Sequence, residues 1–329
     1  MSLELFIMVF ILVFLGTLCL TNILCKQLKK YSVLDCPNDR SSHSSPTPKG
    51  GGIAILAVFF LSLFTLSIFD FFPIDYFYYL FLICSILGTV SFLDDIYGLH
   101  PILRLIIHAV CVYLAISFGL IKGGLFSGLV PPFIEVLIIT IVWVWFVNLF
   151  NFMDGIDGII GVQTVAIGIG VLLIASSVTV GLVGLILAAA ACGFLVLNWY
   201  PAKIFLGDVG SIPVGFLVGW LLLSVAAESN WISTIILSIY FLIDTGFTML
   251  KRLLKGELIW VAHKEHFYQV AAQQRKTHSS VSGSVAIANI FFVILAIFAA
   301  SGYEKLSILG SLIVLALLIF WMLKKPIRQ

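Results

Sequence analysis

Apolar runs of about 20 residues recur along the chain and limit what it can fold into more than any other feature. A helix of that length crosses the roughly 30 Å hydrocarbon core of a bilayer and satisfies its own backbone hydrogen bonds where water is absent. Only 10% of the 329 residues are charged, against about 25% in soluble domains. The sequence therefore predicts an all-α polytopic membrane protein. About eleven transmembrane helices are expected, near residues 3 to 25, 51 to 69, 76 to 93, 102 to 121, 133 to 150, 159 to 177, 181 to 198, 211 to 227, 231 to 250, 285 to 301 and 304 to 323.

The basic residues predict how these helices are oriented. With the N-terminus outside and the C-terminus cytoplasmic, segments 26 to 50 and 251 to 280 place eleven Lys and Arg inside the cell, and five more fall at other inner positions, which makes 16 of 18. Such an excess is typical of cytoplasmic loops. The first apolar run has no basic segment before it and no small-residue cleavage site after it, so a retained helix is expected. The six cysteines show no CxxC or zinc-like spacing and are interpreted as small apolar residues.

Polar motif residues gather in the loops that this orientation places in the cytoplasm. Residues 94 to 95 end the third span, 148 to 157 end the fifth, 208 follows the seventh, and 263 to 266 follow the ninth. Because all these positions are predicted on the cytoplasmic face of the membrane, we expect them to form one shared site. We expect a single domain over residues 1–329, with active-site loops at 26–50, 94–101, 151–158, 199–210 and 251–280.

The segment NLFNFMDGIDGI sets Asn148, Asn151, Asp154 and Asp157 at every third position, with glycines at 155 and 158. Residues three apart lie on one broad face of a helix, so these side chains are expected to converge. Buried carboxylates lose several kcal/mol of hydration unless something pairs with them. A metal ion or a cationic ligand is the simplest compensation.

Two further segments supply carboxylates. In SFLDDIYGL, Asp94 and Asp95 repel each other, so a divalent cation or basic group is expected nearby, unless both simply cap a helix end in water. In NWYPAKIFLGDVGS, glycines beside Asp208 allow close backbone approach to a ligand, and the amides that begin the eighth span can face an anion; an ordinary loop and N-cap is the alternative. Mg²⁺ takes one or two carboxylates together with water and phosphate oxygens. These features predict a magnesium and diphosphate site at the membrane surface.

Two basic segments lie in the same predicted loops. RSSHSSPTPKGGG contains His43 and Lys49 and is either a strap that contacts phosphate or a solvated linker. WVAHKEHFYQ carries His263 and His266, for which zinc would need further Cys or His ligands, so anion binding fits better.

One carboxylate, Asp244, lies inside the ninth span. An ionisable residue within a membrane is a candidate for function, or it pairs with a neighbour such as Lys251 or Arg252. His108 and Glu135 are interpreted as satisfied polar residues.

Four motifs in this order resemble a known family. DD at 94–95, NxxNxxDGxDG at 148–158, NxxPAxxFxGDxGS at 198–211 and HxxHFYQ at 263–269 are similar to the polyprenyl-phosphate N-acetylaminosugar-1-phosphate transferases, glycosyltransferase family 4. These include phospho-N-acetylmuramoyl-pentapeptide transferase and the enzymes that initiate O-antigen assembly. RSSHSSPTPKGGG resembles the RSSHxxPTPRGGG segment of the O-antigen branch. HxxHFYQ replaces the three-histidine run of the peptidoglycan branch, and Gly98 replaces its lysine after DDxx, so that branch's substrate contacts are not carried over.

The resemblance implies roles for the carboxylates. Asp208 would bind Mg²⁺, or Mn²⁺ in its place, with Asp94 or Asp95 beside it. One residue of that pair would deprotonate or orient the lipid phosphate. Asp154 and Asp157 would act at the nucleotide and in the outer coordination sphere of the metal.

The resemblance also implies substrate-binding residues. Asn198 and Phe205 are placed like the uracil contacts of the family, and the two histidines of HxxH would contact the diphosphate or sugar. The expected substrate-binding residues are Asn148, Asn151, Asn198, Phe205, His263, His266, His43 and Lys49.

The implied reaction transfers an N-acetylaminosugar 1-phosphate from a UDP-sugar to undecaprenyl phosphate with release of UMP, at the cytoplasmic side of the bacterial inner membrane. Direct attack and an aspartyl-phosphate intermediate are both open. Alternatives are phospho-N-acetylmuramoyl-pentapeptide transferase and, from another class, a transporter or flippase, which would place polar groups near the bilayer midplane. Membrane lipids are expected partners, nucleic acid is not, and a homodimer is compatible with the sequence.

The orientation leads to a labelling prediction. Single cysteines replacing Asp95, Asp154 and Asp208 in a cysteine-free variant should all resist a membrane-impermeant thiol reagent in intact cells and react after permeabilisation. A cysteine at Lys305 should react from outside and serves as the control. Labelling of any of the three carboxylate positions from outside would contradict the shared cytoplasmic site.

Overall fold

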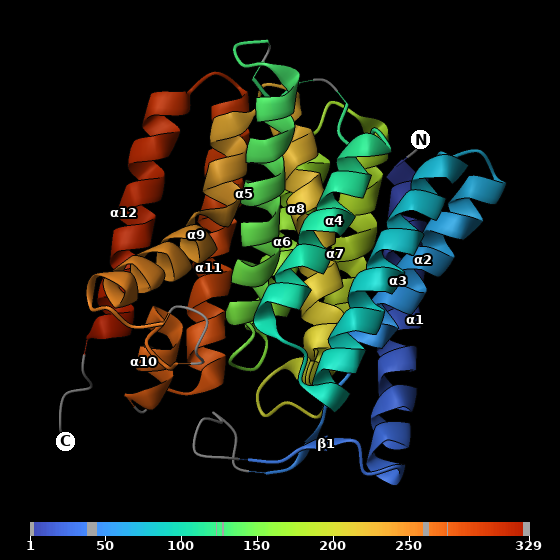
Figure 1. Cartoon of the computed structure of the whole chain (residues 1–329), viewed down its shortest axis with the longest axis vertical. Helices are drawn as coiled ribbons and strands as arrows, with labels where there is room; N and C mark the ends of the chain where they lie inside the picture. Colours follow the sequence, from blue (N-terminus) through green and yellow to red (C-terminus); the bar gives the residue numbers. More distant parts are fainter. Residues whose placement is uncertain are drawn as a thin grey trace.

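The protein is an all-α polytopic membrane protein, and Figure 1 shows a computed structural model in which helices run back and forth between two ends of a bundle. The structure describes residues 3–37, 45–122, 124–126, 128–258, 263–274 and 276–324. We call the end that carries β1 in Figure 1 the motif end. The elements are α1 (Leu3–Lys30), β1 (Leu34–Asp35), β2 (Thr47–Pro48), α2 (Gly52–Ile68), α3 (Ile74–Tyr97), α4 (Pro101–Ser117), α5 (Pro132–Phe152), α6 (Ile159–Ile174), α7 (Val178–Asn198), α8 (Asp208–Ala227), α9 (Trp231–Leu254), α10 (Phe267–Gln273), α11 (His278–Ala300) and α12 (Glu304–Leu323).

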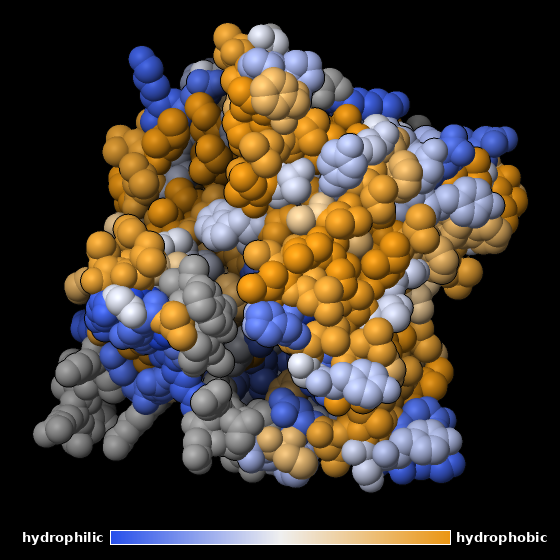
Figure 2. Space-filling model, in the orientation of Figure 1, coloured by the Kyte–Doolittle hydropathy of each residue, from blue (hydrophilic) through white to orange (hydrophobic). Residues whose placement is uncertain are grey.

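Each of the expected spans coincides with a helix. Eight helices in the described part of the chain are long and apolar enough to cross a membrane, while α2, α4 and α6 are shorter apolar helices. At 1.5 Å per residue, a helix of 16 or 17 residues is about 25 Å long, slightly less than the hydrocarbon core. Figure 2 shows a broad hydrophobic belt with hydrophilic residues toward both ends. The number of crossings and the compartment of each terminus stay predictions.

Helix α8 forms the centre of the bundle and is almost entirely buried. Its glycines let neighbours approach closely: a Cβ on Gly215 would lie 2.9 Å from Phe150 Cβ, and one on Gly219 would lie 2.6 Å from Trp143 Nε1. The Trp143 ring stacks on Phe216 at 4.7 Å and its Nε1 donates to the Phe216 carbonyl. Close contact through small residues is how helices associate where lipid is as apolar as the side chains.

Local sequence signals set the ends of several helices. Proline occupies the first position of α4 and α5, where its missing N–H costs nothing. Ser177 and Thr277 accept from the first-turn amides of α7 and α11. At the motif end, β1 and β2 pair antiparallel, with Leu34 opposite Pro48, which folds the segment before α2 back onto the bundle.

The helix boundaries correct two expectations. Segments 26–50, 94–101 and 251–280 begin as helix, because α1 continues to Lys30, α3 to Tyr97 and α9 to Leu254. The interpretation of residues 148 to 157 as one helix face is wrong, because α5 ends at Phe152 and Gly158 takes a φ of +81° before α6 begins. Glycine adopts that backbone conformation readily, so the chain turns there instead of continuing as helix.

The contact between α2 and α8 leads to a stability prediction. A Cβ on Gly52 would lie 2.1 Å from the Cα of Gly210, so Gly52→Ala forces the two helices apart. We expect a loss of about 1–3 kcal/mol, as for other overpacked sites, seen as a lower Tm of the purified protein in detergent. Gly246→Ala is the control, because its Cβ would meet nothing within 4 Å. Equal Tm values for both variants would contradict the prediction.

Candidate active site

Lys49, Asp95 and Asp208 form what we call the charged centre of the motif end. The Lys49 Nζ lies 2.8 Å from Asp95 Oδ1 and 3.6 Å from Asp208 Oδ1, and each side chain is about one third exposed. Burial alone would lower the pKa of Lys49, but the charges of Asp208, Asp95 and Asp35 outweigh it and raise the pKa. The lysine is therefore a cation held between a carboxylate at the end of α3 and one at the start of α8.

Backbone pairing between the segment before α2 and residues 204–207 fixes the position of Lys49. The amides of Gly50 and Gly51 donate to the Phe205 carbonyl at 3.2 and 2.8 Å, and the Phe205 amide donates to Pro48 at 2.8 Å. Gly207 has a φ of +74°, and a Cβ there would lie 3.0 Å from Lys49 Cγ. Phe205, an expected uracil contact, thus has a backbone role at the centre, and its side chain is half-buried.

Asp154 lies in the loop between α5 and α6, within the electrostatic reach of the charged centre. Its pKa is raised to about 7, first by burial and next by the negative charge of Asp208, which Lys49 partly offsets. Tyr268 of α10 packs against this loop, because Gly155 leaves room where a Cβ would lie 2.3 Å from the phenolic oxygen. Because this carboxyl group is costly to ionise, an additional cation nearby would stabilise its charged form.

Asp157 and Asn198 hold two loops of the site together. Asp157 Oδ2 accepts from the Ala202 amide at 3.0 Å. Asn198 accepts from the Gly158 amide at 3.0 Å and donates to the Ile204 carbonyl at 2.9 Å. Both side chains are buried, so the structure gives them partners within the protein.

Asn148 and Asn151 point to different helices. The Asn151 Oδ1 accepts from the Ser211 hydroxyl at 2.5 Å, which ties the end of α5 to the first turn of α8. Asn148 Nδ2 donates to the Val144 carbonyl at 2.7 Å and lies 3.4 Å from His108 Nδ1 on α4. The four residues of NLFNFMDGIDGI therefore do not converge on one point.

The two adjacent aspartates have different surroundings. Arg104 of α4 donates to Asp94 Oδ2, and the Leu99 amide donates to Asp94 Oδ1 at 2.8 Å. Asp95 faces Lys49 instead. Gly98 ends α3 with a φ of +63°, a left-handed conformation that glycine adopts readily at the end of a helix. The geometry thus favours Asp95 over Asp94 as the member of the pair that acts at the charged centre.

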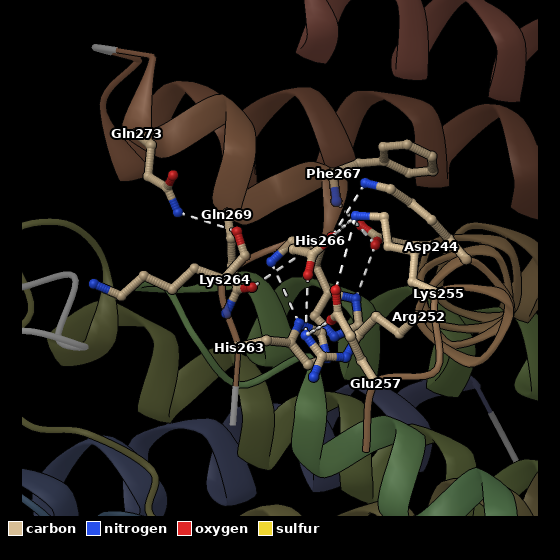
Figure 3. Close-up of polar contacts among 12 residues, drawn as sticks. Asp244, Arg252, Lys255, Glu257, His263, Lys264, His266, Phe267, Gln269 and Gln273 are labelled. Carbon is tan, nitrogen blue, oxygen red and sulfur yellow. Dashed lines mark hydrogen bonds and ion pairs between the residues drawn. The ribbon is translucent and has the colours of Figure 1, made fainter. Parts of the chain in front are cut away.

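The histidine segment is built around Asp244, as Figure 3 shows. Asp244 is fully buried and accepts from the Tyr240 hydroxyl and the amides of Phe267 and Tyr268, and its Oδ1 lies 3.0 Å from His266 Nδ1. These contacts fix the start of α10 on α9. Asp244 therefore pairs with His266, and not with Lys251 or Arg252 as its position in the sequence suggested.

Arg252 anchors the chain that leads to the histidines. Its Nη1 lies 3.0 Å from Glu257 (Figure 3). The same Nη1 lies 3.0 Å from Glu265, and Nη2 donates to the Leu258 carbonyl. The His263 ring lies 4.8 Å from the His266 ring. Burial, followed by the charges of His266 and Arg252, lowers the pKa of His263 to about 4. His263 is thus a neutral hydrogen-bonding group near pH 7, and an ion pair with a phosphate would require substrate to raise its pKa.

Among the described residues, no three His, Cys, Asp or Glu side chains come together in a way that could hold a metal ion alone. The donor set at the charged centre nevertheless suits magnesium, which prefers one or two carboxylates and completes its coordination with water and phosphate oxygens. His43 lies outside the described residues.

Several residues that organise the site carry no motif signal. Arg104 counted in the sequence only as a cytoplasmic charge, yet it neutralises Asp94. His278 lies 3.4 Å from Asp157 Oδ1, and the Ser282 hydroxyl donates to the Asp157 carbonyl. These partners are 10 to 125 positions apart in the chain, so only the tertiary structure brings them together.

Fold and site together define a polytopic membrane protein with a carboxylate-rich centre at one end of its bundle. Residues 77–226 match glycosyl transferase family 4. The chain is 28% identical over 286 residues to the probable undecaprenyl-phosphate N-acetylglucosaminyl 1-phosphate transferase of Bacillus subtilis, which covers 80% of this chain and 76% of that protein. It is 27% identical over 327 residues to the undecaprenyl-phosphate alpha-N-acetylglucosaminyl 1-phosphate transferase of Yersinia pestis, covering 93% and 87%.

A relative from the other branch is similar over a shorter stretch. The phospho-N-acetylmuramoyl-pentapeptide-transferase of Streptococcus pneumoniae is 30% identical over 226 residues, 62% of this chain and 67% of that protein. The chain belongs to glycosyl transferase family 4, the family that the four sequence motifs indicate.

The different surroundings of the two aspartates lead to a prediction. Asp95→Asn should lower kcat by about 100-fold or more with an unchanged Tm, because it removes a charge from the reacting centre. Asp94→Asn should lower the Tm and reduce kcat less, because it leaves Arg104 without its carboxylate. Both are measured on purified protein by thermal unfolding and by release of the nucleotide product. A larger loss of kcat in Asp94→Asn would reverse the assignment.

Proposed function

We propose that this protein transfers an N-acetylaminosugar 1-phosphate from a UDP-sugar to undecaprenyl phosphate, giving undecaprenyl-diphosphate-aminosugar and UMP. The observation that supports it most strongly is the charged centre: Lys49 from the segment between β2 and α2 meets Asp95 of α3 and Asp208 of α8 at the end of an apolar bundle. The B. subtilis and Y. pestis relatives carry this activity in their names. The reaction is the first membrane step of an envelope polysaccharide, and we place it at the cytoplasmic face of a bacterial inner membrane.

The protein's own residues meet the electrostatic demand of this reaction. A lipid phosphate oxygen attacks the sugar-side phosphorus, a new P–O bond forms, and the bond to UMP breaks. Both reactants are anions, so repulsion has to be offset before they approach. Lys49 neutralises one phosphate, and Asp95 accepts a proton from the lipid phosphate or orients it. Direct attack and a covalent intermediate on Asp95 both fit this geometry.

Magnesium is the cofactor we propose, with manganese as a substitute. Asp208 and Asp95 would hold it, and Asp154 would complete the negative surroundings. When bound, the ion supplies charge neutralisation for the two phosphates. With Asp95 and Asp208 paired in this way, Lys49 would contact a phosphate oxygen directly.

The second candidate is phospho-N-acetylmuramoyl-pentapeptide transferase, which shares the acceptor and differs in the sugar donor. The S. pneumoniae relative is the observation in its favour. The HxxH spacing at 263 to 266 and Gly98 at the end of α3 favour the first candidate. A transporter is disfavoured, because the charged centre lies at helix ends and not at the middle of the bundle.

A substrate panel tests the proposal. Purified protein is incubated with undecaprenyl phosphate, magnesium and, one at a time, UDP-N-acetylglucosamine, UDP-N-acetylgalactosamine, deoxy aminosugar derivatives and UDP-N-acetylmuramoyl-pentapeptide, and UMP release is followed. One aminosugar should give turnover that a chelator abolishes and added magnesium restores. Asp208→Asn should lose about 100-fold or more activity while the Tm is maintained. The assignment would be refuted if no donor gave UMP release, or if Asp208→Asn kept full activity.

A further inference from the structure

Tyr268 of α10 is fully buried beneath the loop that carries Asp154. Its hydroxyl donates to the carbonyl of Phe152, the last residue of α5, at 2.9 Å. On the other side of Asp154, Gly155 comes so close that a Cβ there would lie 2.3 Å from the phenolic oxygen. Residues 152–155, which we call the Asp154 turn, therefore contact this one oxygen atom at both of their ends.

The Tyr268 hydroxyl is a hydrogen-bond donor near neutral pH. Burial, followed by the negative charges of Asp244 and Asp154, raises the pKa of Tyr268, so the phenol keeps its proton. A protonated phenol needs an acceptor, and the Phe152 carbonyl provides one. The effect of Asp154 on this pKa also places its carboxyl within electrostatic reach of the phenol. Tyr268 is therefore the side chain that supports the Asp154 turn from within the protein.

The backbone and the ring of Tyr268 contact the histidine segment. Its amide donates to Asp244 Oδ2 at 3.3 Å. Its ring stacks on the His266 ring, with the centroids 5.7 Å apart and an angle of 17° between the planes. Since an aromatic ring is rigid, His266 and the Asp154 turn are held at a fixed separation by this one side chain.

The far end of the loop is held by other residues. The Ser282 hydroxyl of α11 donates to the Asp157 carbonyl at 2.7 Å. Asp157 Oδ2 accepts from the Ala202 amide at 3.0 Å. Both contacts would remain if the Tyr268 hydroxyl were removed, because neither involves it. The Asp154 turn is thus the part of the loop that depends on Tyr268.

We propose that Tyr268 is a positioning residue for the transfer step, which holds Asp154 toward the charged centre and links it to His266; the proposal rests on the proposed transferase function. Asp154 contributes negative charge beside Asp208, and the effect of a charge depends on its distance. A shift of the Asp154 turn would therefore change the electrostatic stabilisation of the reacting phosphates. Because Tyr268 is fully buried, its hydroxyl acts on the rate of transfer and not on substrate binding.

Two matched variants test this role. Tyr268→Phe keeps the ring against His266 and removes only the hydroxyl. It should lower kcat by about tenfold, the rate equivalent of one neutral hydrogen bond, and leave the KM values for both substrates unchanged. Tyr76→Phe is the control, because it also removes a hydroxyl that donates to a backbone carbonyl, that of Gly119 at 3.2 Å, but near the start of α3 at the opposite end of the bundle. It should keep the wild-type kcat.

Hydrogen exchange tests the contact without turnover. The amides of Met153 and Asp154 are hydrogen-bonded to carbonyls of α5, and in the full protein in nanodiscs they should exchange faster in Tyr268→Phe than in the wild type. The Gly158 amide, which donates to Asn198, should exchange as before. Tyr76→Phe should change neither rate. Equal exchange at the Asp154 turn in folded Tyr268→Phe and in the wild type would refute the role of Tyr268.

A second variant reaches the same contact from the loop. The Cβ of Gly155→Ala would displace the phenolic oxygen, so this variant should also lower kcat and speed exchange at the Asp154 turn. It replaces Tyr268→Phe if that protein does not fold. Wild-type kcat and exchange in folded Gly155→Ala would contradict the proposal.

The two proposals fail in different ways. A wild-type protein that releases no UMP from any donor would refute the transferase function, even if Tyr268→Phe loosened the Asp154 turn. An active wild type together with an unchanged kcat in folded Tyr268→Phe would refute the positioning role alone. A raised KM for either substrate, or an equal loss of kcat in Tyr76→Phe, would show a general structural effect and would also refute that role.

Discussion

The charge balance around Lys49 is the interaction on which the motif end depends. Asp95 and Asp208 come from the ends of different helices, and their mutual repulsion would oppose the packing of α3 on α8 without a cation between them. Two of these charges also act on Asp154, since Asp208 raises its pKa while Lys49 lowers it. Because all three charged-centre side chains keep contact with solvent, the lysine can be exchanged for another cation without burying an unpaired charge.

The bundle brings these charges together through contacts between glycines. Gly52 and Gly210 let the start of α2 touch the start of α8, and the segment before α2 then reaches residues 204–207 by backbone hydrogen bonds. Gly168 and Gly184 do the same for α6 and α7 farther from the site. Since lipid offers no hydrophobic driving force between helices, such close packing supplies the attraction. The geometry of the charged centre is therefore a consequence of helix packing.

Sequence reasoning predicted the all-α membrane fold and the meeting of distant loops, because apolar length and charge placement are local properties of the chain. It failed where two different structures are compatible with the same local sequence pattern. The three-residue spacing in NLFNFMDGIDGI suggested one helix face, but α5 ends at Phe152 and the chain turns before α6, with Gly158 at a φ of +81°. Asp94 and Asp95 are neighbours that only Arg104 and Lys49 distinguish. Lys49 was expected to contact phosphate, but its place between Asp95 and Asp208 depends on the backbone pairing of its segment with residues 204–207, which no local pattern predicts.

The carboxylates at this end of the protein are of two kinds. Asp244 is fully buried and its oxygens face Tyr240, His266 and two backbone amides, so any change of partner would leave a buried group unsatisfied. It works as a fixed anchor for the histidine segment. Asp95 and Asp208 share one lysine and are partly exposed, so they can change partners at low cost. Binding of substrates and metal is therefore expected where the partners are exchangeable, and the anchored carboxylate keeps the neighbouring segment in place while they exchange.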